Sequence, residues 1–142
     1  MPAGPIRLTL PYPPSVNMYW RYTTLPGRKH GFWRISKKGL LFRRIVVAAC
    51  MAAGIKALKG KLELIEEVWP PDTRTRDLDN IQKALWDALQ HGGCYESDSQ
   101  IKETHQRMHD YSDRRPQGRT EVRLRRIPDS GFQPSLWEDQ DQ

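Results

Sequence analysis

RTRDLDNIQK, residues 74–83, joins a charged, extended segment to an amphipathic helix. The helix is predicted because apolar residues recur on one face, at Ile81, Ala84, Leu85, Ala88 and Leu89. Asp79 or Asn80 is the predicted N-cap, and Gln82 is placed to complete a capping box with Asp79. Gly92-Gly93 then ends the helix, because glycine adopts the left-handed conformation that closes a helical turn.

Two carboxylates, Asp77 and Asp79, lie two positions apart in this stretch. If the segment is still extended there, both side chains project from one face. Lys83 lies one helical turn beyond Asp79, so its ammonium group can reach the same point. Two carboxylates and an ammonium group at a helix N-terminus suit a hard divalent cation and a phosphate. The spacing therefore predicts a metal site that acts on phosphate groups.

A structural role explains the same residues. Asp79 would cap the helix, Asp77 would pair with a flanking arginine, and Lys83 would pair with Asp87 at i+4. A third reading is another metal-dependent phosphoryl-transfer enzyme, because a bare D-x-D also occurs in haloacid-dehalogenase phosphatases and in glycosyltransferases. Those phosphatases have an apolar strand just before the motif, whereas residues 73–76 are TRTR. The preceding sequence therefore disfavours the phosphatase class.

The charge of the chain predicts a polyanionic partner. The 142 residues form a single domain by length and carry a formal net charge of +6. All 23 Lys and Arg lie in residues 1–127 together with 13 of the 17 acids, so this part carries +10. Nucleic acid is the default partner of such a body, and a merely basic surface is the alternative. We divide the chain into a domain, 1–127, and an acidic tail, 128–142.

The sequence gives no sign of a membrane or an oxidising compartment. No apolar run is long enough to span a bilayer, and the N-terminus lacks the apolar core of a signal peptide. Cys50 and Cys94 lie far apart in the sequence, without partners at metal-ligand spacing. We therefore expect a cytoplasmic protein with reduced thiols.

The order of elements predicts one α/β or α+β domain. Ser36 is the predicted N-cap of a first helix, from Lys37 to about Ala53, with Leu40, Leu41, Ile45, Val46 and Ala49 as its packing face. Strands are predicted at 6–10, 32–35, 62–69, 100–108 and 120–127. The order ββαβαββ indicates a mixed sheet of about five strands with two helices packed on it.

Residues 16–31 combine aromatic, basic and turn-forming residues. Arg21 lies among Tyr19, Trp20 and Tyr22, and a basic segment around Arg28 and Lys29 follows. Such a loop suits contact with phosphates and stacking on bases. The alternative is that Tyr19 and Trp20 are core anchors.

Four motifs together resemble the RusA-type Holliday junction resolvases, small endonucleases of bacteria and their phages. They are Leu10-Pro11-Tyr12-Pro13-Pro14-Ser15 with Asn17, Ser36-Lys37-Lys38-Gly39, Arg76-Asp77-Leu78-Asp79-Asn80 and Asp98-Ser99-Gln100-Ile101. The combination is specific, whereas each motif alone is weak.

The resemblance implies a homodimeric, magnesium-dependent enzyme, with manganese as the alternative ion. Such an enzyme nicks two opposed strands of a four-way DNA junction during recombination and repair. The family's metal-binding acids fall on Asp77, Asp79 and Asp98, and its active-site lysine falls on Lys83. One departure is Ser97, which stands where the family often has a second acid beside Asp98. The candidate DNA-binding residues are Asn17, Arg21, Arg28, Lys29, Lys37, Lys38, Arg74 and Arg76.

Two points stay open from the sequence. A non-catalytic module that binds branched or single-stranded DNA would share the basic charge and the aromatic residues. The acidic tail could pack on the domain, mimic DNA or bind a protein partner.

Overall fold

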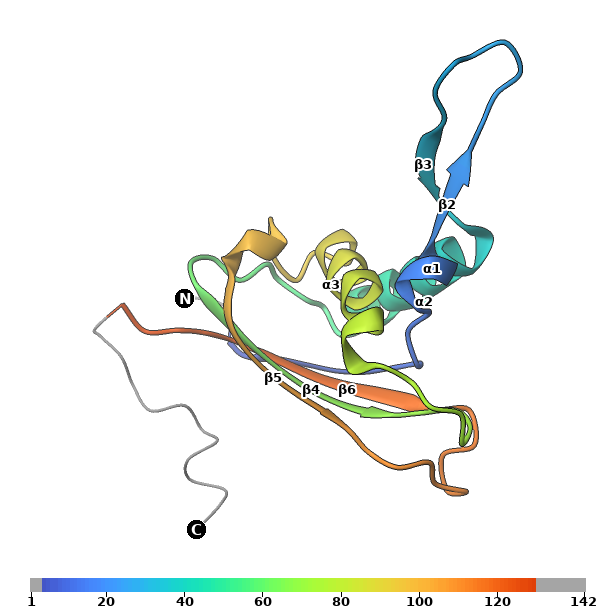
Figure 1. Cartoon of the computed structure of the whole chain (residues 1–142). Coiled ribbons are helices and arrows are strands. Elements are labelled where there is room, and N and C mark those ends of the chain that lie inside the picture. The colour runs from blue at the N-terminus through green and yellow to red at the C-terminus, as the bar shows by residue number, and fades with distance from the viewer. Residues whose placement is uncertain (1–3, 130–142) are drawn as a thin grey trace.

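The structure is a computed structural model that describes residues 4–129. A four-stranded sheet forms one layer, and two helices, α2 and α3, cover one of its faces (Figure 1). The elements are β1 Ile6–Leu10, α1 Val16–Tyr19, β2 Trp20–Thr23, β3 Phe32–Ile35, α2 Lys37–Ala52, β4 Leu62–Trp69, η1 Leu78–Ile81, α3 Gln82–His91, η2 Asp98–Gln100, β5 Ile101–Met108 and β6 Arg119–Arg126, where η marks a 3-10 helix.

The sheet has the strand order β1-β6-β4-β5. β4 pairs parallel with β5 and antiparallel with β6, and β1 pairs antiparallel with β6. Along β1 the residues alternate between buried and exposed, as the sequence predicted for a strand with one covered face. The class, a mixed α+β domain, is therefore confirmed.

The helix α3 is confirmed and provides the centre of the core. Ala84, Leu85, Ala88 and Leu89 are fully buried against the sheet and α2. Gly93 ends the helix region with a φ of +85°, the left-handed conformation that the sequence required.

The predicted packing face of α2 is wrong in part. Leu41 and Ile45 are 60% and 42% exposed, and the buried residues are Gly39, Phe42, Val46 and Cys50. The helix turns this face inward because Gly39 allows a close approach. A Cβ at that position would lie 2.6 Å from the Tyr19 carbonyl oxygen. The predicted cap is confirmed, since the Ser36 hydroxyl accepts a hydrogen bond of 2.9 Å from the Gly39 N–H.

The strand at Phe32–Ile35 lies outside the main sheet. It pairs antiparallel with Trp20–Thr23, where the sequence predicted a loop, and the two strands form a separate ribbon. Of the two candidate core anchors, Tyr19 is fully buried and Trp20 packs partly against the core. Beyond this base the ribbon projects away from the body (Figure 1).

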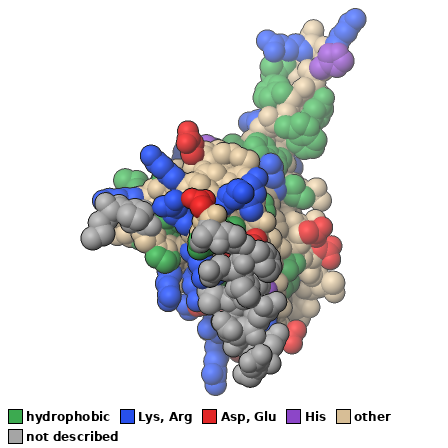
Figure 2. Space-filling model, turned by 90° about the vertical axis from the view of Figure 1, so that its left-hand side faces the viewer, with side chains coloured by type: hydrophobic (Ala, Val, Ile, Leu, Met, Phe, Trp, Pro, Cys, Tyr) green, Lys and Arg blue, Asp and Glu red, His purple; other side chains and the backbone are tan. Residues whose placement is uncertain are grey.

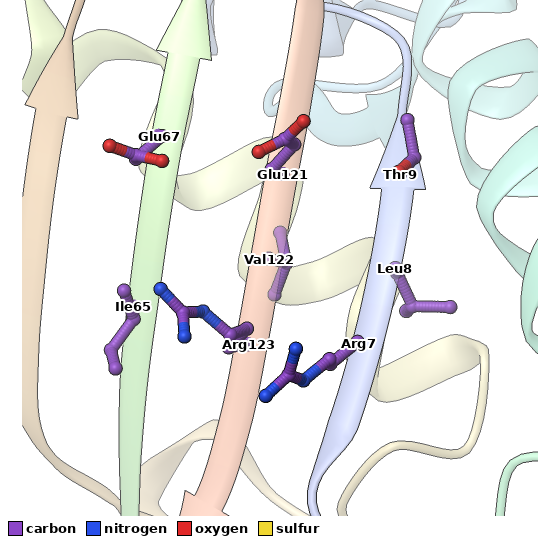
Figure 3. Close-up of a pocket in the computed structure, with 8 residues that line it drawn as sticks. All are labelled: Arg7, Leu8, Thr9, Ile65, Glu67, Glu121, Val122 and Arg123. Carbon is purple, nitrogen blue, oxygen red and sulfur yellow. The ribbon is translucent and has the colours of Figure 1, made fainter.

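The second face of the sheet carries no helix among the described residues (Figure 1). Arg7 and Arg123 lie side by side on it, and Glu67 and Glu121 form a neighbouring row (Figure 3). The charges of this face are therefore mixed rather than uniformly basic.

Two further predictions concern the membrane and the tail. None of the helices within residues 4–129 has both the length and the apolar character needed to cross a membrane. Apart from Pro128 and Asp129, the acidic tail lies outside the described residues, so the division of the chain at residue 127 stays a prediction.

Candidate active site

The acidic stretch forms a 3-10 turn before α3 begins. Asp77 is extended, with φ −95° and ψ 129°, and it precedes η1, whereas Asp79 lies within η1. The predicted N-cap at Asp79 or Asn80 and the capping box are therefore wrong. The side-chain amide of Gln82 instead donates a hydrogen bond of 2.9 Å to the Leu78 carbonyl oxygen, which stabilises the turn. Asp77 is the N-cap residue of η1, but its carboxylate makes no capping hydrogen bond.

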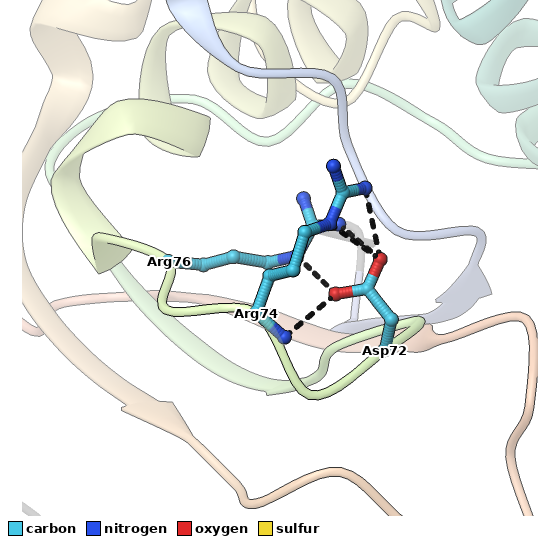
Figure 4. A network of polar contacts seen from close by, with 3 residues as sticks. All are labelled: Asp72, Arg74 and Arg76. Atoms are coloured by element: carbon cyan, nitrogen blue, oxygen red, sulfur yellow. Dashed lines mark hydrogen bonds and ion pairs between the residues drawn. The ribbon is translucent and has the colours of Figure 1, made fainter.

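The arginines before the turn do not pair with Asp77. Arg74 and Arg76 both donate to the carboxylate of Asp72, with closest distances of 2.9 and 2.7 Å (Figure 4). Hydrogen bonds from these two guanidinium groups hold the pKa of the Asp72 carboxyl well below its usual range. Asp72 is thus the acid with which both arginines pair.

Asp77 and Asp79 are both exposed and carry uncompensated charge. Asp77 accepts one hydrogen bond, 3.3 Å long, from the Asn80 side-chain amide. Within residues 4–129, no Lys or Arg forms an ion pair with either acid. Two unpaired carboxylates two positions apart fit a hard cation such as Mg²⁺, which prefers oxygen ligands and keeps several of its waters.

Lys83 is exposed on α3, one turn beyond Asp79. The predicted alternative pairing with Asp87 is wrong, because Asp87 is already occupied. It accepts a hydrogen bond of 2.8 Å from Arg43 and a second, short one from the Tyr19 hydroxyl. Burial of the Tyr19 ring, together with this bond to Asp87, raises the pKa of the phenol. Lys83 is therefore left available to a ligand at the acidic turn.

Asp98 lies at the other end of α3. Its backbone N–H points at the side-chain oxygen of Gln90, 3.3 Å away, in the last turn of the helix. Asp79 precedes the first turn, and a helix of ten residues is about 15 Å long. Among the described residues, no three His, Cys, Asp or Glu side chains are grouped so that they could hold a metal ion. In one chain, Asp77, Asp79 and Lys83 therefore lie at the start of α3 and Asp98 lies at its other end.

Ser97, the departure from the family pattern, has a structural role. Its hydroxyl accepts a hydrogen bond of 3.2 Å from the Ser99 N–H and completes a capping box with Gln100. Gln100 also donates to the carbonyl oxygens of Leu58 and Gly60, at 3.0 and 2.9 Å. Ser97 therefore helps to fix the turn that carries Asp98.

The candidate DNA-binding residues fall in two places. Arg74 and Arg76 line one groove beside the acidic turn, together with Lys38 of α2 and the proline-rich segment 11–14. The others lie on or around the β2–β3 ribbon: Asn17, Arg21, Arg28, Lys29 and Lys37, with Arg28 and Lys29 between the two strands. Lys38 lies between the two places, since it also lines a hollow with Arg21 and Lys37. The ribbon thus extends the basic surface away from the acids.

Sequence reasoning missed Glu66, a buried acid beneath the turn. It is 0% exposed, and burial raises its pKa to about 7. Gln82 and Gln106 lie beside the carboxyl group, but neither oxygen of Glu66 has a hydrogen-bond partner of good geometry within the described chain. The two-residue period of the strand could have indicated that Glu66 is buried. Glu66 shares one face of β4 with Leu62, Leu64 and Val68, which are all buried.

We expect the free energy of unfolding of Glu66→Gln, relative to that of the wild-type protein, to be larger at pH 8 than at pH 5. An acid whose pKa is raised in the folded chain opposes folding when it ionises, so stability is lost as the pH rises from about 4.5 to about 7. The glutamine removes this loss, and the gain between the two pH values is about 2–3 kcal/mol. Urea unfolding of both proteins at each pH measures it. Glu67→Gln, at a partly exposed neighbour in β4, is the matched control, and an equal gain there would contradict the assignment to Glu66.

Exposed carboxylates beside a basic groove are typical of the class of proteins that act on a polyanion. A model of the family described as "Endodeoxyribonuclease RusA" matches residues 11–125. Two bacterial relatives, both named "Crossover junction endodeoxyribonuclease RusA", come from Shigella sonnei (strain Ss046) and Escherichia coli (strain K12). They are 41% and 40% identical over 98 residues, which cover 66% of this chain and 74% of each relative. The relative from Enterobacteria phage HK97 is 38% identical over 67% of this chain and 75% of its own length.

The chain belongs to the RusA endodeoxyribonuclease family. The resemblance seen in the sequence is therefore confirmed, and with it the endonuclease class.

Proposed function

We propose that the protein is a magnesium-dependent endonuclease that resolves four-way DNA junctions by paired, symmetric nicks. The observation that supports this is the pair of exposed, uncompensated carboxylates, Asp77 and Asp79, beside Lys83 in a chain of this family. Relatives named for crossover junctions come from bacteria and from phages, which supports action on DNA in the bacterial cytoplasm.

Each residue of the turn has a distinct role in this proposal. Asp77 and Asp79 would hold the ion, which supplies an acidic bound water and neutralises charge on the scissile phosphate. Lys83 would stabilise the negative charge that develops on the phosphate oxygens. The Gln82 amide donates to the Leu78 carbonyl oxygen and so fixes the backbone of the turn, and both carboxylates are exposed. Arg74 and Arg76, held by Asp72, would contact the DNA backbone nearby.

A homodimer would complete the acidic site. Asp98 lies at the far end of α3 from Asp79 within one chain, whereas a second copy can bring its own Asp98 to the first copy's turn. A four-way junction is close to two-fold symmetric, so a C2 dimer also presents one site to each of two opposed strands. The proposal therefore includes a site shared between two subunits.

The second candidate is a DNA-binding module without catalysis, which the same basic surface would serve. A pure binding protein gains nothing from unpaired acids near the phosphates, because they repel the backbone. The exposed carboxylates of Asp77 and Asp79 therefore favour the enzyme.

The test is cleavage of labelled DNA by the purified protein. A four-way junction, the matched duplex and a single strand are each incubated with Mg²⁺, with Mn²⁺ and with EDTA. Paired nicks in the junction alone, dependent on a divalent ion, are expected. Tight binding of the junction without any cleavage would contradict the proposed enzymatic activity and favour the non-catalytic DNA-binding module.

A further inference from the structure

The β2–β3 ribbon has two chemically different faces. The cross-strand pairs are Trp20–Ile35, Arg21–Arg34, Tyr22–Trp33 and Thr23–Phe32. Because side chains alternate along a strand, Tyr22 and Trp33 lie on one face and Arg21 and Arg34 on the other.

The arginine face is built from cations without counter-charges. Arg21 and Arg34 stand directly opposite each other, a like-charge arrangement that destabilises an isolated ribbon. Both line one hollow with Lys37 and Lys38 of the first turn of α2. None of the four forms an ion pair within the part of the chain that the structure describes. The hollow therefore suits an anion from outside the chain.

The aromatic face is exposed and ordered by local contacts. Trp33 is 68% and Tyr22 54% exposed, and their rings meet edge to face with centroids 5.3 Å apart. The Tyr22 hydroxyl accepts a hydrogen bond of 2.9 Å from the Gly31 N–H, which fixes its ring. The Trp33 ring borders a hollow formed with Val16, Asn17 and Trp20. A flat ring can therefore lie against Trp33 without displacing the core.

The position of the ribbon argues for a function beyond folding. Figure 2 shows hydrophobic side chains on the projecting segment, with Lys, Arg and His at its tip. Arg28 and Lys29 lie in the loop that joins the two strands of the aromatic pair. A protein interface usually excludes charge from its centre, whereas nucleic acid combines flat apolar bases with a charged backbone. The combination of faces matches a single strand of DNA.

We propose that the ribbon enters the branch point of the junction, where Trp33 stacks on an unpaired base and the opposite, Arg21–Arg34 face holds a phosphate of the DNA backbone. This inference rests on the proposed function for its substrate. It adds Arg34 and Trp33 to the DNA-binding residues and assigns recognition of the branch, rather than of duplex arms, to the ribbon. Stacking of a base on an aromatic side chain is sequence-tolerant, so the ribbon would serve any junction sequence.

The test measures binding in EDTA, where no cleavage occurs. Trp33→Ala is expected to weaken junction binding about 5- to 150-fold, the range for one lost base stack, with duplex binding little changed. Trp33→Phe is expected to retain most of the affinity. Met51→Ala, an apolar residue of α2 with 77% exposure, is the matched control and leaves both affinities unchanged. A 2-aminopurine base at the branch point is expected to be quenched by the wild-type protein and not by Trp33→Ala.

The arginine face has a separate readout. Arg34→Gln is expected to make the plot of log affinity against log salt shallower by about one unit, the value for one lost phosphate contact. An equal loss of duplex and junction affinity in Trp33→Ala, or an unchanged salt slope in Arg34→Gln, would overturn the proposal.

The outcomes separate this inference from the function on which it rests. The wild-type protein could bind the junction and quench the branch-point base without cutting the DNA. That result would contradict the proposed cleavage activity and leave the ribbon's role intact. Dissociation of a dimer by Trp33→Ala, measured by sedimentation without DNA, would instead make the aromatic face an interface between two copies and overturn the proposal.

Discussion

Asp79→Asn is expected to stop cleavage of a four-way junction while junction binding stays the same or becomes tighter. The change removes one ligand of the proposed ion and one negative charge beside the DNA backbone, without changing the size of the side chain. The loss of cleavage rate is expected to reach about 10²–10³-fold, the range for removing one electrostatic contact to the transition state. Single-turnover cleavage and a binding titration in EDTA measure the two effects separately.

The matched control is Asp110→Asn, an exposed acid that follows β5. It makes the same change of charge outside the acidic turn, so cleavage is expected to continue at the wild-type rate. An Asp79→Asn protein that is folded but no longer binds the junction would contradict the proposed role. Equal losses of cleavage in both variants would attribute the effect to total charge.

A mixture of Asp79→Asn and Asp98→Asn subunits is expected to recover cleavage that neither variant shows alone. In a shared site, Asp77 and Asp79 come from one subunit and Asp98 from the other. The mixed dimer then holds one site with all three acids and one site with both substitutions. Because only one site works, the mixed dimer is expected to nick a single strand of each junction rather than two opposed strands.

The same mixture distinguishes the alternatives. If all three acids came from one chain, both sites of the mixed dimer would lack an acid, and no activity would return. The separately purified variants are each assayed at the same total concentration as the control for residual cleavage. Mixing two preparations of Asp79→Asn carrying different tags confirms that subunits exchange under the conditions used. Exchange without any recovered nicking would contradict the shared site.

The elements with clear periodicity were predicted correctly from the sequence. α3 is an example, since Ala84, Leu85, Ala88 and Leu89 repeat on one face and all four are buried. The packing face of α2 was not predicted correctly, because both Leu41 and Phe42 are apolar and helical spacing alone does not choose between them. The choice came from Gly39, whose missing Cβ lets the helix approach Tyr19.

The candidate site also has a part that was predicted from the sequence and a part that was not. The local part, Asp77 and Asp79 with Lys83 one turn on, follows from residues close in sequence and needs only the start of a helix. Asp72 was overlooked, although it binds the two arginines that a sequence argument would assign to Asp77. The buried Glu66 was also overlooked, because its environment is made by Gln82 and Gln106 from two other elements.

The sequence by itself determined the α+β class, the family and the acidic turn, because hydrophobic period and short motifs depend on neighbouring residues. Only the tertiary structure decided that β2 and β3 leave the main sheet as a two-faced ribbon, and that Asp98 lies a helix length away from Asp79. Strand partners and distances between motifs depend on long-range packing, in which each element buries its apolar face against whichever surface fits it. Local patterns do not encode that fit.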